Sequence, residues 1–323
     1  MKKFRVLSDL HLDPEINGNY PLEIKDKDVF TVICGDTAGE HQYGYEWIAK
    51  NVKNGILVNG NHMPYNFEHK TMQEQREELA KKYPLDGNVT YLDAEIDRIK
   101  KEVDGIVFLG SCMYSNMRIA YPGNPSGDPT SNKMVSHRNM NDFRYGIKEK
   151  VYDFGPDNEP RYVKITPQDY QDWFINAFKQ MEKFLSENEA SENPKPVVLV
   201  THYPLIKTLL ENSYYESVYN NYASYGSDME YWIKMHPSIK CYCCGHAHDI
   251  DPKWRHWKLE QDNGSKCLVV NNARGYVYAG HAHNFNPNTF VNTTTWEIEQ
   301  DSMPKKKARK LSDKDIEMLP LFF

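Results

Sequence analysis

The sequence lacks the features of membrane proteins and exported proteins. No stretch of its 323 residues approaches the roughly 18–20 consecutive apolar residues that a membrane helix needs. The first residues, MKKFRVLSDLHL, contain lysines but no long apolar segment of the kind found in signal peptides. We therefore expect a cytoplasmic protein with no membrane partner.

Cysteine is too sparse and too irregularly spaced for a disulfide framework or a zinc ribbon. There are 6 cysteines, and three of them, Cys241, Cys243 and Cys244, lie together without the paired spacing of zinc motifs. A chain of this length can bury a core large enough to be stable without cross-links. We expect free, mostly buried thiols in a reducing compartment.

An overall positive charge is also absent. The net charge of −6 argues against a broad surface for nucleic acid, although a local patch or a metal site could still bind it. A dense basic segment, PKKKARK, occupies residues 304–310. We predict that residues 301–323 form a basic, flexible tail behind a domain that spans residues 1–300.

The sequence does contain short apolar segments that end in polar residues. These segments predict buried strands at residues 4–7, 29–34, 55–58, 106–111, 197–200, 239–244, 267–271 and 293–298. Helices are predicted at residues 45–53, 71–83 and 167–185, the last with Thr166 as its N-cap and Pro167 in its first turn. This order predicts a layered α/β domain, with two sheets packed together and helices outside.

A long segment between two of these strands is rich in glycine, proline, asparagine and serine. Residues 112–165 therefore read as irregular, and we predict that they form a functional insertion or a lid. The alternative is a structural excursion without a role in substrate selection.

Polar residues follow five of the predicted strands at the point where each strand ends. They are Asp9, His11, Asp36, Asn61, His62, His202, His246 and His248. Ligands bind at the carboxyl ends of strands in open α/β sheets, so we expect these residues to converge. Carboxylate, imidazole and amide ligands without thiolates suit Mn, Fe, Zn or Ni rather than a structural zinc site.

Asp36 is the natural residue to bridge two metal ions. Gly35 lets the backbone turn sharply beside it, and a central carboxylate can hold two ions about 3.5–4 Å apart. Such ions polarise a phosphoryl oxygen and lower the pKa of a bridging water. We predict two divalent metal ions as cofactors, with manganese favoured over iron, zinc or nickel.

These segments resemble the signature of the calcineurin-like metallophosphoesterase superfamily. The matching residues are Asp9-Leu10-His11, Gly35-Asp36, Gly60-Asn61-His62, Thr201-His202 and Gly245-His246-Ala247-His248. The resemblance implies a four-layer α/β/β/α sandwich of two mixed sheets flanked by helices. Residues 140–144, 165–167 and 271–276 further resemble bacterial and phage members that lack an assigned substrate.

The resemblance also implies a role for each polar residue. One metal would be held by Asp9, His11, Asp36 and His248. The other would be held by Asp36, Asn61, His202 and His246. His62 would not be a ligand but a general acid for the leaving oxygen. Many members carry an acidic residue after the Asn-His pair, whereas this chain has Met63.

The expected activity is hydrolysis of a phosphomonoester or a phosphodiester by in-line attack of a hydroxide that bridges the metals. The substrate could be a nucleotide or a nucleic acid. We predict that Arg144 and Arg274 clamp a phosphate oxygen, with Arg274 assisting catalysis, and that Tyr203 faces the substrate cleft. The alternatives are pairing of each arginine with a structural carboxylate, and packing for Tyr203. We interpret His281 and His283 as loop histidines.

Two other functions compete with this hypothesis. The first is a DNA nuclease or repair phosphodiesterase that its tail recruits to DNA. The second is a non-catalytic nucleotide-binding module that has kept the fold, although no ligand of the expected set is missing from the sequence.

The tail generates a prediction of its own. Met318-Leu319-Pro320-Leu321-Phe322 resembles the short apolar peptide that docks into the bacterial sliding clamp, and it follows the basic segment. We expect a pull-down with a sliding clamp to retain the full chain and to lose the chain without residues 318–323. Equal retention of both would contradict the clamp hypothesis and favour packing of this peptide onto the domain.

Overall fold

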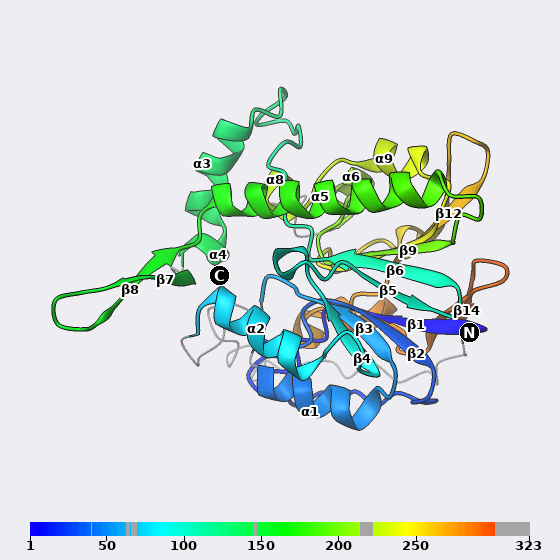
Figure 1. Ribbon diagram of the computed structural model, residues 1–323, viewed down its shortest axis with the longest axis horizontal. Helices are drawn as coiled ribbons and strands as arrows, with labels where there is room; N and C mark the ends of the chain where they lie inside the picture. Colours follow the sequence, from blue (N-terminus) through cyan, green and yellow to red (C-terminus); the bar gives the residue numbers. More distant parts are fainter. Residues whose placement is uncertain (40, 63–64, 66–69, 145–146, 214–221, 301–323) are drawn as a thin grey trace.

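Two six-stranded mixed sheets pack against each other, and helices cover their outer faces (Figure 1). The computed structural model describes residues 1–39, 41–62, 65, 70–144, 147–213 and 222–300. The four-layer arrangement confirms the fold class expected from the sequence. The predicted clamp peptide and basic tail lie outside the described residues.

The first sheet contains the strands that carry the amino-terminal motifs. Its order is β14-β13-β1-β2-β3-β4, in which β1 to β4 are parallel and β13 and β14 are antiparallel neighbours. The strands are β1 (Lys3–Leu7), β2 (Phe30–Cys34), β3 (Gly55–Val58), β4 (Val89–Leu92), β13 (Thr289–Asn292) and β14 (Glu297–Gln300). Its outer face is covered by α1 (His41–Asn51) and α2 (Met72–Lys82) (Figure 1).

The second sheet contains the strands that carry the later histidines. Its order is β11-β12-β10-β9-β6-β5, with a parallel centre and an antiparallel strand at each edge. The strands are β5 (Lys100–Val103), β6 (Ile106–Ser111), β9 (Val197–Thr201), β10 (Ile239–Cys244), β11 (His256–Glu260) and β12 (Lys266–Asn271).

The long helix α5 (Pro167–Glu189) and the shorter α9 (Glu230–Met235) lie over the outer face of the second sheet (Figure 1). Shorter helical segments of this body are α6 (Lys207–Glu211), α8 (Tyr222–Tyr225), η2 (Ala94–Ile96), η3 (Pro252–Trp254), η4 (Val277–Ala279) and η5 (His281–Asn284). Among the described residues, no helix combines the length and the apolar character needed to cross a bilayer.

The central strands are apolar throughout because both of their faces are buried. In β9, Val198 and Val200 pack between the two sheets, whereas Val197 and Leu199 face the helical layer and contribute to the cluster that contains Met181 of α5. Parallel strands with covered faces therefore appear in a sequence as continuous apolar runs. This is why their positions could be predicted.

The cysteines belong to the core. All six are free and buried, as the sequence analysis expected. Cys34, Cys241 and Cys243 lie in the cluster between the sheets, where burial raises the pKa of each thiol. Neutral, buried thiols of this kind are chemically inert.

The segment predicted to be irregular contains regular structure instead. It forms α3 (Pro129–Asn139), α4 (Asn141–Arg144) and a hairpin of β7 (Lys148–Phe154) and β8 (Pro160–Lys164), which projects from the body of the protein (Figure 1). Asp128 caps α3 by accepting a hydrogen bond from the Ser131 amide at 2.9 Å, and Pro129 occupies the first turn. This helix starts at an aspartate followed by a proline. The glycine, proline, asparagine and serine content of the segment therefore did not mean that it is irregular. A lid function remains a prediction.

The last predicted strand, at residues 293–298, was also misplaced. These residues form the whole turn between β13 and β14, at residues 293–296, and only the start of β14. The Asn292 side chain accepts hydrogen bonds from the amides of Thr294 and Thr295, at 2.8 Å and 3.1 Å. Local bonding of this kind favours a turn over the β propensity of the threonines.

The helix α2 begins with a capping box that Thr71 and Glu74 form. The Glu74 amide donates to Thr71 Oγ1 at 3.2 Å, and the Thr71 amide donates to the Glu74 carboxylate at 2.7 Å. This capping box satisfies two amides that the helix itself leaves without partners. We expect Thr71→Ala to lower the free energy of unfolding by about 1 kcal/mol in urea titrations. Gln73→Ala, an exposed change in the same helix, is the control, and equal stabilities would contradict the prediction.

Candidate metal centre

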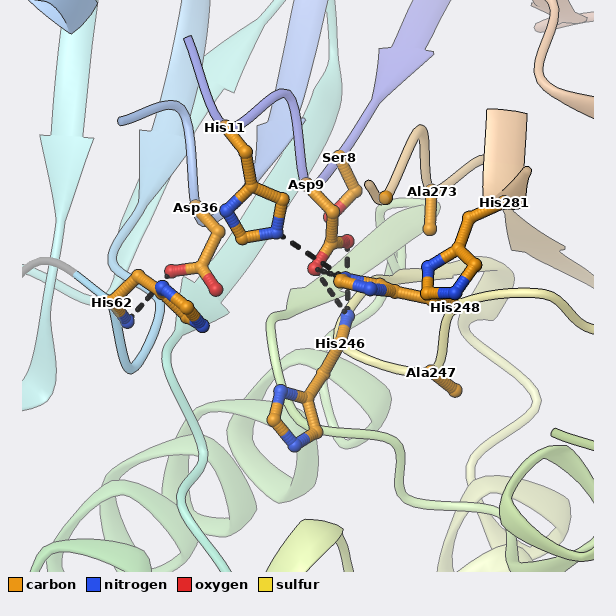
Figure 2. Close-up of polar contacts among 12 residues, drawn as sticks. Ser8, Asp9, His11, Asp36, His62, His246, Ala247, His248, Ala273 and His281 are labelled. Carbon is orange, nitrogen blue, oxygen red and sulfur yellow. Dashed lines mark hydrogen bonds and ion pairs between the residues drawn. The ribbon is translucent and has the colours of Figure 1, made fainter. Parts of the chain in front are cut away.

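The predicted ligands converge at one edge of the sandwich, where strands of both sheets end. Asp9 and His11 follow β1, and Asp36 follows β2. His202 and His246 follow β9 and β10 of the other sheet. Figure 2 shows Asp9, His11 and Asp36 close to the histidines that come from the second sheet.

A first group of ligand atoms is formed by Asp9, His11 and His248. These atoms lie within 4.8 Å of one another. His248 Nε2 is 2.8 Å from Asp9 Oδ1 and 3.4 Å from His11 Nε2. Two imidazole nitrogens so close to a carboxylate form an arrangement that a divalent cation would satisfy.

A second group contains Asp36, His202 and His246, whose ligand atoms also lie within 4.8 Å of one another. Asp36 Oδ2 is 3.3 Å from His202 Nε2, and the amide oxygen of Asn61 is 3.1 Å from the same nitrogen. The structure therefore brings Asn61 to the edge of this group.

His62 lies where the two groups meet. One of its ring nitrogens shares a third group with His11 and Asp36, and its backbone amide donates to Asp36 Oδ1 at 3.0 Å. Because His11 and Asp36 each belong to two groups, the three groups form one continuous centre. His62 is close enough to ligand atoms to act on a group bound between them.

Several atoms in this centre suit a metal because they lack an ordinary hydrogen-bond partner. Among the described residues, the buried atoms His11 Nδ1 and His246 Nε2 have no hydrogen bond, and Asp36 Oδ2 has only its ion pair with His202. Buried polar atoms are normally hydrogen-bonded, so each atom without a partner requires an explanation. Three such atoms in one cluster of carboxylates and imidazoles fit the coordination of cations.

Electrostatics in the centre favours the ligating forms of Asp9, His11 and His246. Burial alone would raise the pKa of Asp9, but His248 outweighs it and holds that pKa below the usual range. Burial lowers the pKa of His11 and of His246 far below the usual value for histidine. Ionised carboxylates and neutral imidazoles are the forms that bind metals.

Asp36 and His202 form a buried ion pair. Burial would raise the pKa of Asp36, but the facing His202 keeps it well below its usual range. Burial opposes the charge on His202, yet Asp36 raises its pKa to about 9. A cation that binds here therefore replaces the proton on His202 as the partner of Asp36.

The backbone at the centre is held in a conformation that most residues avoid. Asp9, His11, Asp36 and His246 have φ angles of 53°, 45°, 46° and 64°. A left-handed conformation costs a non-glycine residue on the order of 1–2 kcal/mol. Such strain persists only where the surrounding structure enforces it, and it gathers at functional sites.

Glycines in the motifs make room for the ligands. A Cβ atom on Gly60 would lie 2.0 Å from Asp36 Oδ1, and one on Gly245 would lie 2.5 Å from Asp9 Oδ2. The two glycines allow the carboxylates to pass close to the backbone of neighbouring loops. Both belong to the sequence motifs, but the motifs alone did not indicate this role.

Asp142 supports Asn61 from behind. Its buried carboxylate accepts hydrogen bonds from Asn61 Nδ2 at 3.2 Å and from the hydroxyls of Tyr170 and Tyr203 at 2.6 Å and 3.3 Å. Burial raises the pKa of Asp142 to about 6. By holding the amide nitrogen, Asp142 directs the Asn61 oxygen towards His202. The sequence motifs did not indicate this contact between Asp142 and a candidate ligand.

The structure corrects the interpretation of Tyr203. This residue is 0% exposed, so it does not face a substrate cleft. Its ring stacks on His246 with a centroid distance of 4.3 Å, and Tyr225 lies against His246 at 5.3 Å. Tyr203 therefore has the packing role that was its alternative, and it fixes the orientation of His246.

The structure also corrects the interpretation of Arg274. Its buried guanidinium donates to the backbone oxygen of Leu10 at 3.3 Å and to that of Tyr20. Its backbone amide donates to the Ser8 oxygen at 2.9 Å. Arg274 thus braces the loop that carries Asp9 and His11, and among the described residues it forms no ion pair with a carboxylate.

The other predicted residues are less constrained. Arg144 is exposed, with Nη1 3.4 Å from Asn141 Oδ1, and its phosphate-binding role remains a prediction. His281 is buried, and its ring centroid lies 5.5 Å from that of His248, so it belongs to the layer behind the ligands. Met63 and the side chain of His283 lie outside the described residues.

Comparisons with known proteins support the fold. No protein-family model and no curated protein matches this chain. Among solved structures, the chain is similar to a phosphopantetheinyl hydrolase from Mycobacterium tuberculosis, with a TM-score of 0.57 and 16% sequence identity. The similarity covers 95% of this chain and 98% of that one. At this identity the similarity shows a shared fold.

The close approach of Gly60 to Asp36 yields a prediction about metal binding. We expect Gly60→Ala to displace the Asp36 carboxylate and to weaken Mn²⁺ binding by about tenfold or more, as measured by calorimetry. Gly44→Ala is the matched control, because its Cβ would make an ordinary contact of 3.6 Å with Thr37. Unchanged Mn²⁺ affinity in Gly60→Ala would show that Asp36 is not a ligand.

Proposed function

We propose that this protein is a metal-dependent phosphoric ester hydrolase that uses two divalent ions. The observation that carries the proposal is the pair of ligand groups, Asp9–His11–His248 and Asp36–His202–His246, joined through His11 and Asp36 in one buried centre. Two groups so close together fit a dinuclear site better than two independent mononuclear sites.

Each ion would have its own set of ligands around the shared Asp36. One set is Asp9, His11, Asp36 and His248, and the other is Asp36, Asn61, His202 and His246. When bound, two such cations polarise a phosphoryl oxygen and provide a hydroxide nucleophile at neutral pH. The mixture of nitrogen and oxygen ligands suits manganese first, and iron, zinc or nickel as alternatives.

The protein itself would supply the proton for the leaving group. A water that has already lost one proton to the solvent would bond to phosphorus through its oxygen, and the bond between phosphorus and the leaving oxygen would break. His62, whose backbone amide donates to Asp36 Oδ1 at 3.0 Å, would give the leaving oxygen a proton. Exposed Arg144, two residues beyond Asp142, remains our candidate for binding a substrate phosphate.

The solved structure of similar fold gives independent support for the reaction class. That protein is by its name a hydrolase acting on phosphopantetheinyl groups. This agrees with hydrolysis of a phosphate ester, while the substrate of this chain could equally be a nucleotide or a nucleic acid.

The two competing functions differ from this proposal in ways that can be tested. A nuclease recruited through Met318–Phe322 would catalyse the same reaction and would also bind a sliding clamp. A nucleotide-binding module without catalysis would keep the fold but would need no complete ligand set, and the described residues include all seven expected ligands. The complete set therefore favours an enzyme.

The proposal predicts an activity that depends on metal. We expect metal-stripped protein to be inactive and added Mn²⁺ to restore hydrolysis, measured on aryl phosphates, cyclic and linear phosphodiesters and single-stranded DNA. Asp36→Asn and His202→Ala should each lower that activity by about 100-fold or more, because they remove ligands.

A matched variant controls for the change of charge at a strained position. Asp26 has a φ of 49°, close to the 46° of Asp36, but it is exposed and precedes β2, at the opposite end of the strand. Asp26→Asn should therefore retain activity. Full activity in metal-stripped protein would overturn the proposal.

A further inference from the structure

One polar contact at the centre involves a residue with no expected role as a ligand. The hydroxyl of Tyr276 lies 3.1 Å from Nε2 of His62. The Tyr276 ring also lies against the rings of His11 and His248, with centroid distances of 4.8 Å and 5.0 Å. Tyr276 therefore touches the first ligand group with its ring and His62 with its hydroxyl.

The backbone before Tyr276 is fixed to the loop that carries the first ligands. The Gly275 amide donates to the Asp9 oxygen at 3.0 Å. The Asn17 side chain donates to the oxygens of Leu10 and Gly275, at 3.0 Å and 2.9 Å. Because these bonds hold both segments together, the position of the Tyr276 hydroxyl is set by the same loop that sets Asp9.

The neighbours of His62 restrict its ring in different ways. The rings of His11 and Tyr65 lie edge-on to it, with centroid distances of 4.7 Å and 4.9 Å. Such contacts limit the space for the imidazole, but they do not distinguish its two flipped orientations. A hydrogen bond to one named nitrogen does distinguish them, and it also influences which nitrogen carries a proton.

We propose that Tyr276 is a positioning residue whose hydroxyl holds the His62 imidazole in the orientation that delivers a proton to the leaving oxygen. The inference rests on the proposed function and adds to it a residue with no assigned role. In the step it supports, the attacking hydroxide oxygen forms a bond to phosphorus, the bond from phosphorus to the leaving oxygen breaks, and that oxygen takes a proton from His62. Tyr276 itself neither gains nor loses a proton.

The test removes the Tyr276 hydroxyl and compares two substrates whose leaving groups differ in their need for a proton. Tyr276→Phe keeps the ring packing against His11 and His248. A p-nitrophenyl ester has a leaving group that is stable as an anion, whereas a phenyl ester depends more on protonation. We expect kcat to fall about tenfold or more on the phenyl ester and less than about threefold on the p-nitrophenyl ester, measured with Mn²⁺ and either monoesters or diesters.

A double variant separates action through His62 from a general structural effect. If Tyr276 acts through His62, then Tyr276→Phe combined with His62→Ala should hydrolyse the phenyl ester no more slowly than His62→Ala alone. Bound Mn²⁺, measured by metal analysis, should be unchanged in Tyr276→Phe. Tyr278→Phe, which removes a hydroxyl from the ring stacked on Tyr276, is the control and should match the wild type.

The outcomes distinguish this inference from the proposed function. Equal losses on both esters, additive losses in the double variant, or loss of Mn²⁺ from Tyr276→Phe would each overturn the role of Tyr276 and leave the hydrolase proposal standing. A wild-type protein that hydrolyses neither ester with Mn²⁺ would overturn the proposed function and this inference together.

Discussion

A buried carboxylate, Asp36, is the constraint on which the site depends. It is 1% exposed, and burial by itself would favour its neutral form. The facing His202 and the amide of His62 keep it charged, at 3.3 Å and 3.0 Å. A buried charge needs such partners, because water no longer stabilises it. The residues around Asp36 are therefore required to stabilise its buried charge, whether or not a substrate is bound.

The packing of the two sheets offsets the free-energy cost of this arrangement. Asp36, Asp9 and His246 adopt left-handed backbone conformations, which the isolated chain would avoid. The apolar cluster between the sheets fixes β1, β2 and β10, from which these loops emerge. Gly60 and Gly245 then let the carboxylates approach backbone that a Cβ atom would block. Strain at the centre is thus compensated by burial of apolar surface beneath it.

A second layer of polar contacts turns a set of ligands into an oriented site. Asp142 fixes the amide of Asn61, Tyr203 stacks on His246, and Arg274 braces the loop between Asp9 and His11. Outer contacts of this type determine the orientation and basicity of metal ligands. In this protein each contact comes from a segment far in sequence from the residue that it orients, and Asp142 lies on the helix α4, which the composition did not predict.

The sequence by itself determined the central strands and the residue types at their ends. Apolar runs such as Val197–Val200 predict strands because buried parallel strands need no polar face. The motifs predicted the positions of the candidate ligands because the motif residues directly follow those strands. Arg274 and Tyr203 were misjudged because their partners lie in other segments. Only the tertiary structure decided which nitrogen or oxygen each side chain meets, because that choice depends on distances between residues far apart in sequence, such as Arg274 and Leu10, which are 264 positions apart.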